Sequence, residues 1–106
     1  MGKHKCMGKY KVKIFPAAQN DLRDIVDYLN TLSPDAALQY YDLIIEKIGT
    51  LTTMPERCPL AKDTQFRLRG YRTLLVKNYI VFYVINGKTV EIRRVLFARR
   101  QYEELL

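Results

Sequence analysis

The stretch YIVFYVI (residues 79–85) decides the fold, because it is an uninterrupted run of strand-forming residues. Such a run indicates a central strand that is buried on both faces. Asn86-Gly87 follows directly and is the favoured pair for a type I′ hairpin turn, so residues 89–97 should return as the next strand. On the other side, YRTLLV (residues 71–76) is strand-like, and Lys77-Asn78 is suited to a tight turn into the central strand. We therefore predict three sequential strands in the C-terminal half.

One strand and two helices precede these three strands. YKVKIF (residues 10–15) alternates lysine with apolar residues, as a half-buried strand does, and Pro16 ends it. Ser33-Pro34-Asp35 supplies a cap, a first-turn proline and a first-turn acid for a second helix, which should end before Pro55. Between Pro16 and Ser33, residues 17–31 have the apolar spacing of an amphipathic helix, which is the first of the two helices. Its apolar positions are Ala18, Leu22, Ile25 and Leu29.

The predicted fold class is α+β, with the order β-α-α-β-β-β. A two-helix hairpin packs on one face of a mostly antiparallel four-stranded sheet and leaves the other face for function. Residues 55–65 should form a loop, and residues 98–106 a short C-terminal helix. Residues 1–8 are expected to be a flexible tail outside the fold, and residues 9–106 should form a single domain. Met7-Gly8-Lys9 repeats the opening Met1-Gly2-Lys3, which suggests an alternative start.

The charge is divided unevenly along the chain of 106 residues, whose formal net charge is +7. Residues 14–56 carry two basic residues against seven acidic ones, whereas residues 57–106 carry eleven against four, and eight of those eleven are arginine. Arginine matches phosphate and carboxylate oxygens and stacks on bases. The C-terminal half therefore favours an RNA, a nucleoprotein or an acidic protein as partner, with solubility alone as the alternative.

The residue inventory excludes several chemistries. Ser33 is the only serine and is used as a helix cap, and His4, the only histidine, lies in the tail, which argues against a catalytic triad. No glycine-rich phosphate loop or metal-ligand spacing occurs, so we expect no metal and no cofactor. Cys6 and Cys58 are isolated and expected to be reduced thiols. With neither a signal peptide nor an apolar span, the protein is expected in the cytoplasm and away from membranes.

The acidic residues of the first helix are not expected to be catalytic. Asp21, Asp24 and Asp27 recur every three residues, which indicates a solvated acidic stripe. Positive side chains come instead from the last three strands and the tail, and could gather on one sheet face beside aromatic residues. Because Arg93 and Arg94 are adjacent in a strand, we expect them to point to opposite faces. Such a cluster could stabilise charge on phosphorus while a tyrosine or water moves protons, or it could simply bind.

Several segments together resemble the RelE/ParE superfamily of type II toxin–antitoxin toxins. The resemblance runs from Tyr10 through nearly the whole chain. Its most specific segments are YRTLLV (71–76), NYIVFYV (78–84) and VEIRRVLFARR (90–100), supported by AQNDLRDI (18–25) and SPDAA (33–37). The resemblance implies a growth-inhibiting toxin that a cognate antitoxin holds inactive through an acidic segment, bound as a helix and an extended strand. A homodimer or a toxin–antitoxin heterotetramer would be compatible with it.

Two targets are implied by this resemblance. RelE-like members cleave messenger RNA in the ribosomal A site without a metal, as endoribonucleases, whereas ParE-like members poison DNA gyrase by binding. The chain is more similar to the ParE side, the plasmid-stabilisation branch. It has Ile80 and Phe97 where many ribonuclease members have an arginine and a histidine. A degenerate toxin that only binds its antitoxin or nucleic acid is the alternative.

The resemblance also implies roles for individual residues. In a nuclease, the arginines would stabilise the transition state and the tyrosine would transfer protons, which makes the catalytic candidates Arg72, Arg99, Arg100 and Tyr102. The candidates for binding nucleic acid or another target are Arg67, Arg69, Lys77 and Arg94. Arg72→Ala is expected to abolish toxicity while leaving the fold intact.

Overall fold

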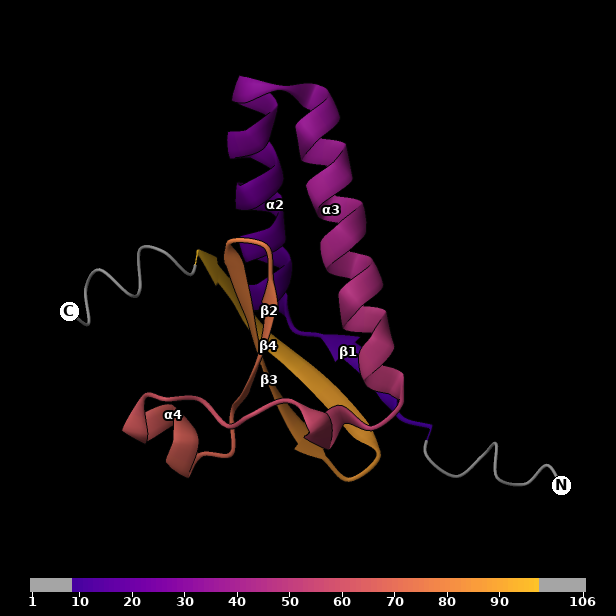
Figure 1. The fold of residues 1–106 in the computed structure, drawn as a ribbon, viewed down its shortest axis with the longest axis vertical. Coiled ribbons are helices and arrows are strands. Elements are labelled where there is room, and N and C mark those ends of the chain that lie inside the picture. The colour runs from indigo at the N-terminus through magenta and orange to yellow at the C-terminus, as the bar shows by residue number, and fades with distance from the viewer. Residues whose placement is uncertain (1–8, 98–106) are drawn as a thin grey trace, which may run out of the picture.

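The computed structural model describes residues 9–97, and their order of elements confirms the predicted α+β arrangement (Figure 1). The predicted tail (1–8) and C-terminal helix (98–106) lie outside the described residues. The elements are β1 (Lys11–Ile14), α2 (Pro16–Leu32), α3 (Pro34–Gly49), 3₁₀ turns at Thr50–Thr52 and Pro55–Arg57, α4 (Thr64–Leu68), β2 (Arg72–Val76), β3 (Tyr79–Asn86) and β4 (Thr89–Phe97).

The four strands form one mixed sheet in the order β1-β4-β3-β2. β3 is antiparallel to both neighbours, β2 and β4, while β1 runs parallel to β4. A hairpin turn joins each antiparallel pair, whereas the parallel pair needs the long crossover that the two helices provide. In β3, Tyr79 to Tyr83 are buried and the last three residues are less so, so the predicted burial on both faces holds for the first five positions.

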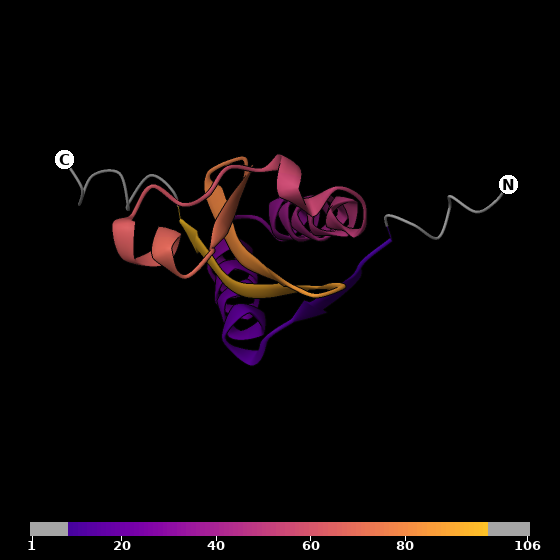
Figure 2. The same ribbon diagram turned by 90° about the horizontal axis from the view of Figure 1, so that it is seen from below.

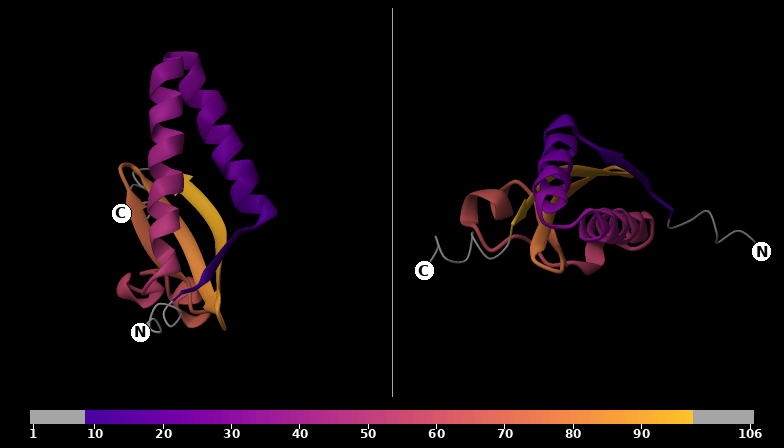
Figure 3. Two further views of the ribbon diagram at one scale, coloured as in Figure 1. Left: turned by 90° about the vertical axis from the view of Figure 1, so that its right-hand side faces the viewer. Right: turned by 90° about the horizontal axis from the view of Figure 1, so that it is seen from above.

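The helices α2 and α3 cover one face of the sheet, as predicted. They are joined at one end and spread apart toward the sheet, which the left view of Figure 3 shows. Pro16 ends β1 and also begins α2, because its fixed φ suits the first helical turn. Ser33 caps α3 by accepting a hydrogen bond from the Ala36 N–H at 3.3 Å. The main core joins both helices to the sheet through Ala18, Leu22, Ile44, Ile48, Val81, Tyr83, Val90, Ile92 and Val95.

The predicted loop at residues 55–65 is wrong in part, because it contains a 3₁₀ turn and the start of α4. Asp63 begins α4: its Oδ1 accepts from the N–H groups of Gln65 and Phe66 at 2.9 and 3.2 Å. The Phe66 ring then packs edge-on against Phe82 of β3, with centroids 5.4 Å apart. The strands pass between the helix pair and α4 (Figure 2), so the second face is partly covered rather than bare.

The turn after β3 also differs from the prediction. Asn86 pairs with Thr89 inside the ladder, so the two loop residues are Gly87 and Lys88 rather than Asn86 and Gly87. Gly87 has φ +63° and Lys88 has no positive φ, which excludes a type I′ turn and fits the glycine-first requirement of type II′. The Asn-Gly signal identified the hairpin correctly but placed its turn one residue too early.

Tyr83 fastens the 3₁₀ turn at Pro55–Arg57 to the sheet. Its side chain is fully buried, and its hydroxyl donates to the Pro55 carbonyl at 2.6 Å. The pKa of Tyr83 is raised, mainly by burial and then by a hydrogen bond with the Cys58 thiol, while the charges of Arg72 and Arg57 oppose the shift. The phenol is therefore a neutral donor, and Cys58 is a buried free thiol.

We predict that Tyr83→Phe lowers the free energy of unfolding by about 1–3 kcal/mol, because the Pro55 carbonyl loses its buried donor. Urea denaturation measures this change. The matched control is Tyr41→Phe, whose side chain is exposed and which should change stability by less than about 0.5 kcal/mol. Equal losses in the two variants would contradict the structural role of the Tyr83 hydroxyl.

Candidate functional site

Arg72, the first residue of β2, makes hydrogen bonds with residues 56–58, next to the Pro55 carbonyl that Tyr83 contacts. Its Nη1 donates to the carbonyls of Cys58 and Glu56 at 2.6 and 3.2 Å. Arg72 lies directly opposite Tyr83 in the sheet, and residues that face each other across a pair share a face. Because Tyr83 belongs to the main core, Arg72 is on the helix-covered side.

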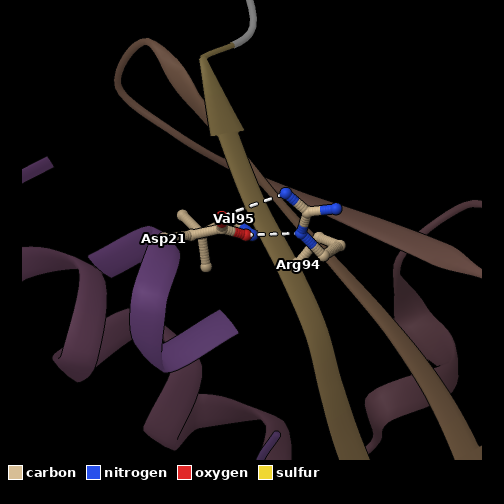
Figure 4. A network of polar contacts seen from close by, with 3 residues as sticks. All are labelled: Asp21, Arg94 and Val95. Carbon is tan, nitrogen blue, oxygen red and sulfur yellow. Dashed lines mark hydrogen bonds and ion pairs between the residues drawn. The ribbon is translucent and has the colours of Figure 1, made fainter. Parts of the chain in front are cut away.

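Arg94 is held by a carboxylate of α2, as Figure 4 shows. Its Nε and Nη2 donate to Asp21 Oδ2 and Oδ1 at 2.7 and 3.0 Å, and Oδ2 also accepts the Val95 N–H at 2.9 Å. The hydrogen bond to Asp21 raises the pKa of Arg94, with burial acting in the opposite direction. The ion pair is bidentate, which is the geometry in which an arginine binds a carboxylate most specifically.

The position of Asp21 follows from the unequal lengths of two strands. β1 pairs with β4 only as far as Ile14 and Ile92, and the Phe15 N–H donates to the Ile92 carbonyl just beyond. β4 continues to Phe97 without β1 beside it, and the Asp21 carboxylate accepts the hydrogen bond of the Val95 N–H on that edge. The prediction of a solvated stripe is therefore wrong for Asp21, whose side chain is 12% exposed.

Arg93 occupies a bulge in β4. Arg94 pairs with Phe82 and Ile92 with Tyr83, so Arg93 has no partner in the β3 ladder. A bulge breaks the alternation of side chains. The Arg93 guanidinium lies 5.7 Å from the centroid of the Tyr71 ring, while Ile92 and Val95, on either side of the two arginines, both belong to the main core. The prediction that the two arginines point to opposite faces is therefore wrong.

The candidate cations are distributed over several places. Arg94 pairs with Phe82 of the second apolar cluster, so Arg72 and Arg94 are on opposite faces of the sheet. Three exposed residues lie elsewhere: Arg67 in α4, Arg69 at its C-terminal cap and Lys77 in the β2–β3 turn, where φ is +56°. The structure thus does not bring Arg72 and Arg94 together. The tail candidates, which lie outside the described residues, are Arg99, Arg100 and Tyr102.

Within residues 9–97, no group of three histidine, cysteine or carboxylate side chains is placed to hold a metal ion. No helix in the same range is long and apolar enough to cross a membrane. What the described part of the chain offers is a set of arginines held by carbonyls, a carboxylate or aromatic rings. Such groups suit the recognition of a large anionic or mixed partner surface.

The fold is similar to that of two solved structures of toxin–antitoxin proteins. Of two solved structures that the chain resembles, one is described as the chromosomal ParDE toxin–antitoxin system from P. aeruginosa, with a TM-score of 0.73 and 22% identity over 84% of this chain and 96% of that chain. The other, described as the RelBE2 toxin–antitoxin complex from Mycobacterium tuberculosis, has a TM-score of 0.54 and 24% identity over 86% and 93%.

A match to a protein-family model shows the family to which the chain belongs. Residues 12–102 match the model of the ParE toxin of the type II toxin–antitoxin system parDE, so the chain belongs to the ParE toxin family of type II toxin–antitoxin systems. A search of curated proteins found no match. The sequence resemblance to the RelE/ParE superfamily and the preference for its ParE side are confirmed.

We predict that Asp21→Ala lowers the free energy of unfolding by about 1–3 kcal/mol, because the Val95 N–H and the Arg94 guanidinium both lose their acceptor. Asp21→Asn, which keeps one acceptor oxygen, should lose less. Asp24→Ala on the exposed side of the same helix is the matched control, expected within about 0.5 kcal/mol of the parent. Chemical denaturation of the three variants checks the order, and a loss for Asp24→Ala as large as for Asp21→Ala would refute it.

We predict that Arg72→Ala also lowers stability by about 1–3 kcal/mol, because two carbonyls lose a charged donor. The expectation of an intact fold is thus revised to a weakened one. Arg67→Ala removes the same charge from an exposed position of α4 and should change stability by less than about 0.5 kcal/mol. Thermal unfolding followed by circular dichroism compares the two, and identical midpoints would show that the Arg72 contacts do not stabilise the fold.

Proposed function

We propose that this toxin inhibits growth by binding DNA gyrase in the cytoplasm through its basic C-terminal half, without cleaving RNA. The observation that carries the proposal is the position of Arg72. Its Nη1 is already occupied by the carbonyls of Glu56 and Cys58, on the helix-covered side of the sheet. A phosphate-stabilising arginine needs its fork directed at the reacting group, so this arrangement favours a binding role.

Two further positions support binding over cleavage. Ile80 stands where many ribonuclease relatives carry an arginine, and its side chain is 8% exposed within the second apolar cluster. Phe97 stands where many carry a histidine, and its ring packs against Tyr79 with centroids 5.5 Å apart. Neither side chain transfers a proton or carries a charge. Both positions contribute packing in place of the charge stabilisation and proton transfer that cleavage requires.

The remaining candidates keep their proposed roles. Arg67, Arg69 and Lys77 would contact the target, and Arg94 would do so through the exposed part of the side chain that Asp21 holds. Arg99, Arg100 and Tyr102 would anchor the same interface from the C-terminal end. We propose that an acidic antitoxin segment covers this surface, because the two similar structures are described as toxin–antitoxin assemblies. If the chain were instead a ribosome-dependent nuclease, Arg99 and Arg100 would stabilise the transition state and Tyr102 would transfer the proton.

Two assays on the purified chain test the proposal. In a supercoiling assay, the chain should inhibit gyrase or trap it on DNA, and Arg99→Ala combined with Arg100→Ala should weaken that inhibition by about tenfold or more, as expected for interface anchors. Arg23→Ala combined with Lys47→Ala removes the same charge from the acidic helix pair and should leave inhibition within about twofold.

In a translation reaction, the chain should leave messenger RNA uncut at codon-defined positions. Cuts of that kind would overturn the proposal in favour of the ribonuclease. Inactivity in both assays, for a chain whose circular dichroism shows the folded state, would leave the degenerate toxin that only binds its antitoxin or nucleic acid.

A further inference from the structure

Two cations and three aromatic rings form a series of contacts in a partly exposed part of the protein. The Lys13 Nζ lies 5.6 Å from the centroid of the Phe15 ring, and the Arg93 guanidinium carbon lies 4.7 Å from the same centroid. That guanidinium carbon is also 5.7 Å from the Tyr71 centroid, and Tyr71 stacks on Phe66 at 5.2 Å with an interplanar angle of 21°. We call these five residues the cation–ring ladder.

Distant parts of the chain build this ladder because of local backbone features. The β4 bulge frees Arg93 from the ladder of β3, and the hydrogen bond from the Phe15 N–H to the Ile92 carbonyl holds the first ring beside it. The Tyr71 N–H donates to the Phe66 carbonyl at 3.0 Å, which holds the second ring. The arrangement therefore depends on backbone contacts of β1, β4 and α4.

Arg93 differs from Arg72 and Arg94 in how strongly it is held. Among the described residues, its ion pair is a single contact from Nη1 to Glu91 Oε1 at 3.4 Å, and its side chain is 36% exposed. Arg94, by contrast, makes a two-pronged pair at 2.7 and 3.0 Å. Rings beside a guanidinium interact with its face, while its N–H donors lie in the plane of the group and point outward. Arg93 is thus oriented by the rings, with only a weak competitor for an incoming oxyanion.

We propose that the cation–ring ladder binds single-stranded nucleic acid, with backbone phosphates at Lys13 and Arg93 and a base against the ring of Phe15. Closely spaced cations and rings serve both parts of a nucleotide, its phosphate and its base. An acidic peptide would use the cations alone, so the rings favour nucleic acid. The proposal goes beyond gyrase binding and does not depend on it, since DNA and RNA share this chemistry.

Fluorescence anisotropy of the full chain with labelled single strands of oligo(dT) and oligo(U), equal in length, tests the proposal. Arg93→Ala should weaken binding by about tenfold or more, because both the phosphate contact and the ring arrangement are lost. Arg93→Lys keeps the charge but not the planar fork and should weaken binding several-fold. Lys47→Ala is the control: it removes the same charge from the acidic helix pair and should change affinity less than about twofold.

Each outcome supports or contradicts the proposal that the cation–ring ladder binds nucleic acid. Tighter binding of oligo(dT) would indicate DNA as the natural ligand and tighter binding of oligo(U) would indicate RNA, and either supports the site when Arg93→Ala reduces it. No binding by the parent chain, or equal losses for Arg93→Ala and Lys47→Ala, would overturn the proposal, because net charge would then explain any attraction. Circular dichroism of every variant confirms that it is folded. Gyrase inhibition is measured separately, so each proposal fails on its own evidence.

Discussion

The structure depends on how the β4 edge is closed where β1 ends. β1 is four residues long and β4 is nine, so half of β4 would present backbone donors without a partner strand. Asp21 closes this edge by accepting the Val95 N–H, and the Arg94 fork neutralises its charge. This carboxylate thereby adds a polar contact between α2 and β4 to the apolar contacts that Ala18 and Leu22 make with the sheet. The same contact engages an arginine that would otherwise point into solvent.

A second constraint acts on the segment between α3 and β2. The Tyr83 hydroxyl and the Arg72 guanidinium hold the carbonyls of Pro55, Glu56 and Cys58 from the sheet side. Farther along, Phe66 packs on Phe82 and Tyr71 stacks on Phe66. The segment between α3 and β2 therefore runs past the β2 edge, and apolar contacts hold it on the second face of the sheet. This is why the second face bears aromatic rings beside cations rather than an open surface of arginines.

These two constraints change which arginine is the best candidate for recognition. A basic composition suggests that arginines act together, but Arg72 and Arg94 are occupied on opposite faces. Arg93, which strand alternation would separate from Arg94, lies on the same face as Arg94 because of the bulge. The sequence could not predict this arrangement. It contains Tyr71, Phe66 and Arg93, but nothing in it locates the bulge in β4 that brings Arg93 beside Tyr71.

The sequence by itself determined the four strands, the two long helices and the family, because the periodicity of residues 10–54, the buried run of β3 and the cap at Ser33 are local properties that neighbouring residues impose on the backbone. It also determined the uneven distribution of charge along the chain, because that distribution follows directly from the positions of the charged residues in the sequence. Only the tertiary structure decided that Asp21 is an edge cap, that α4 covers the second face and that Arg93 stands beside Phe15. Each of these depends on residues far apart in the chain, and on strand lengths and a bulge that arise only when the whole sheet is assembled.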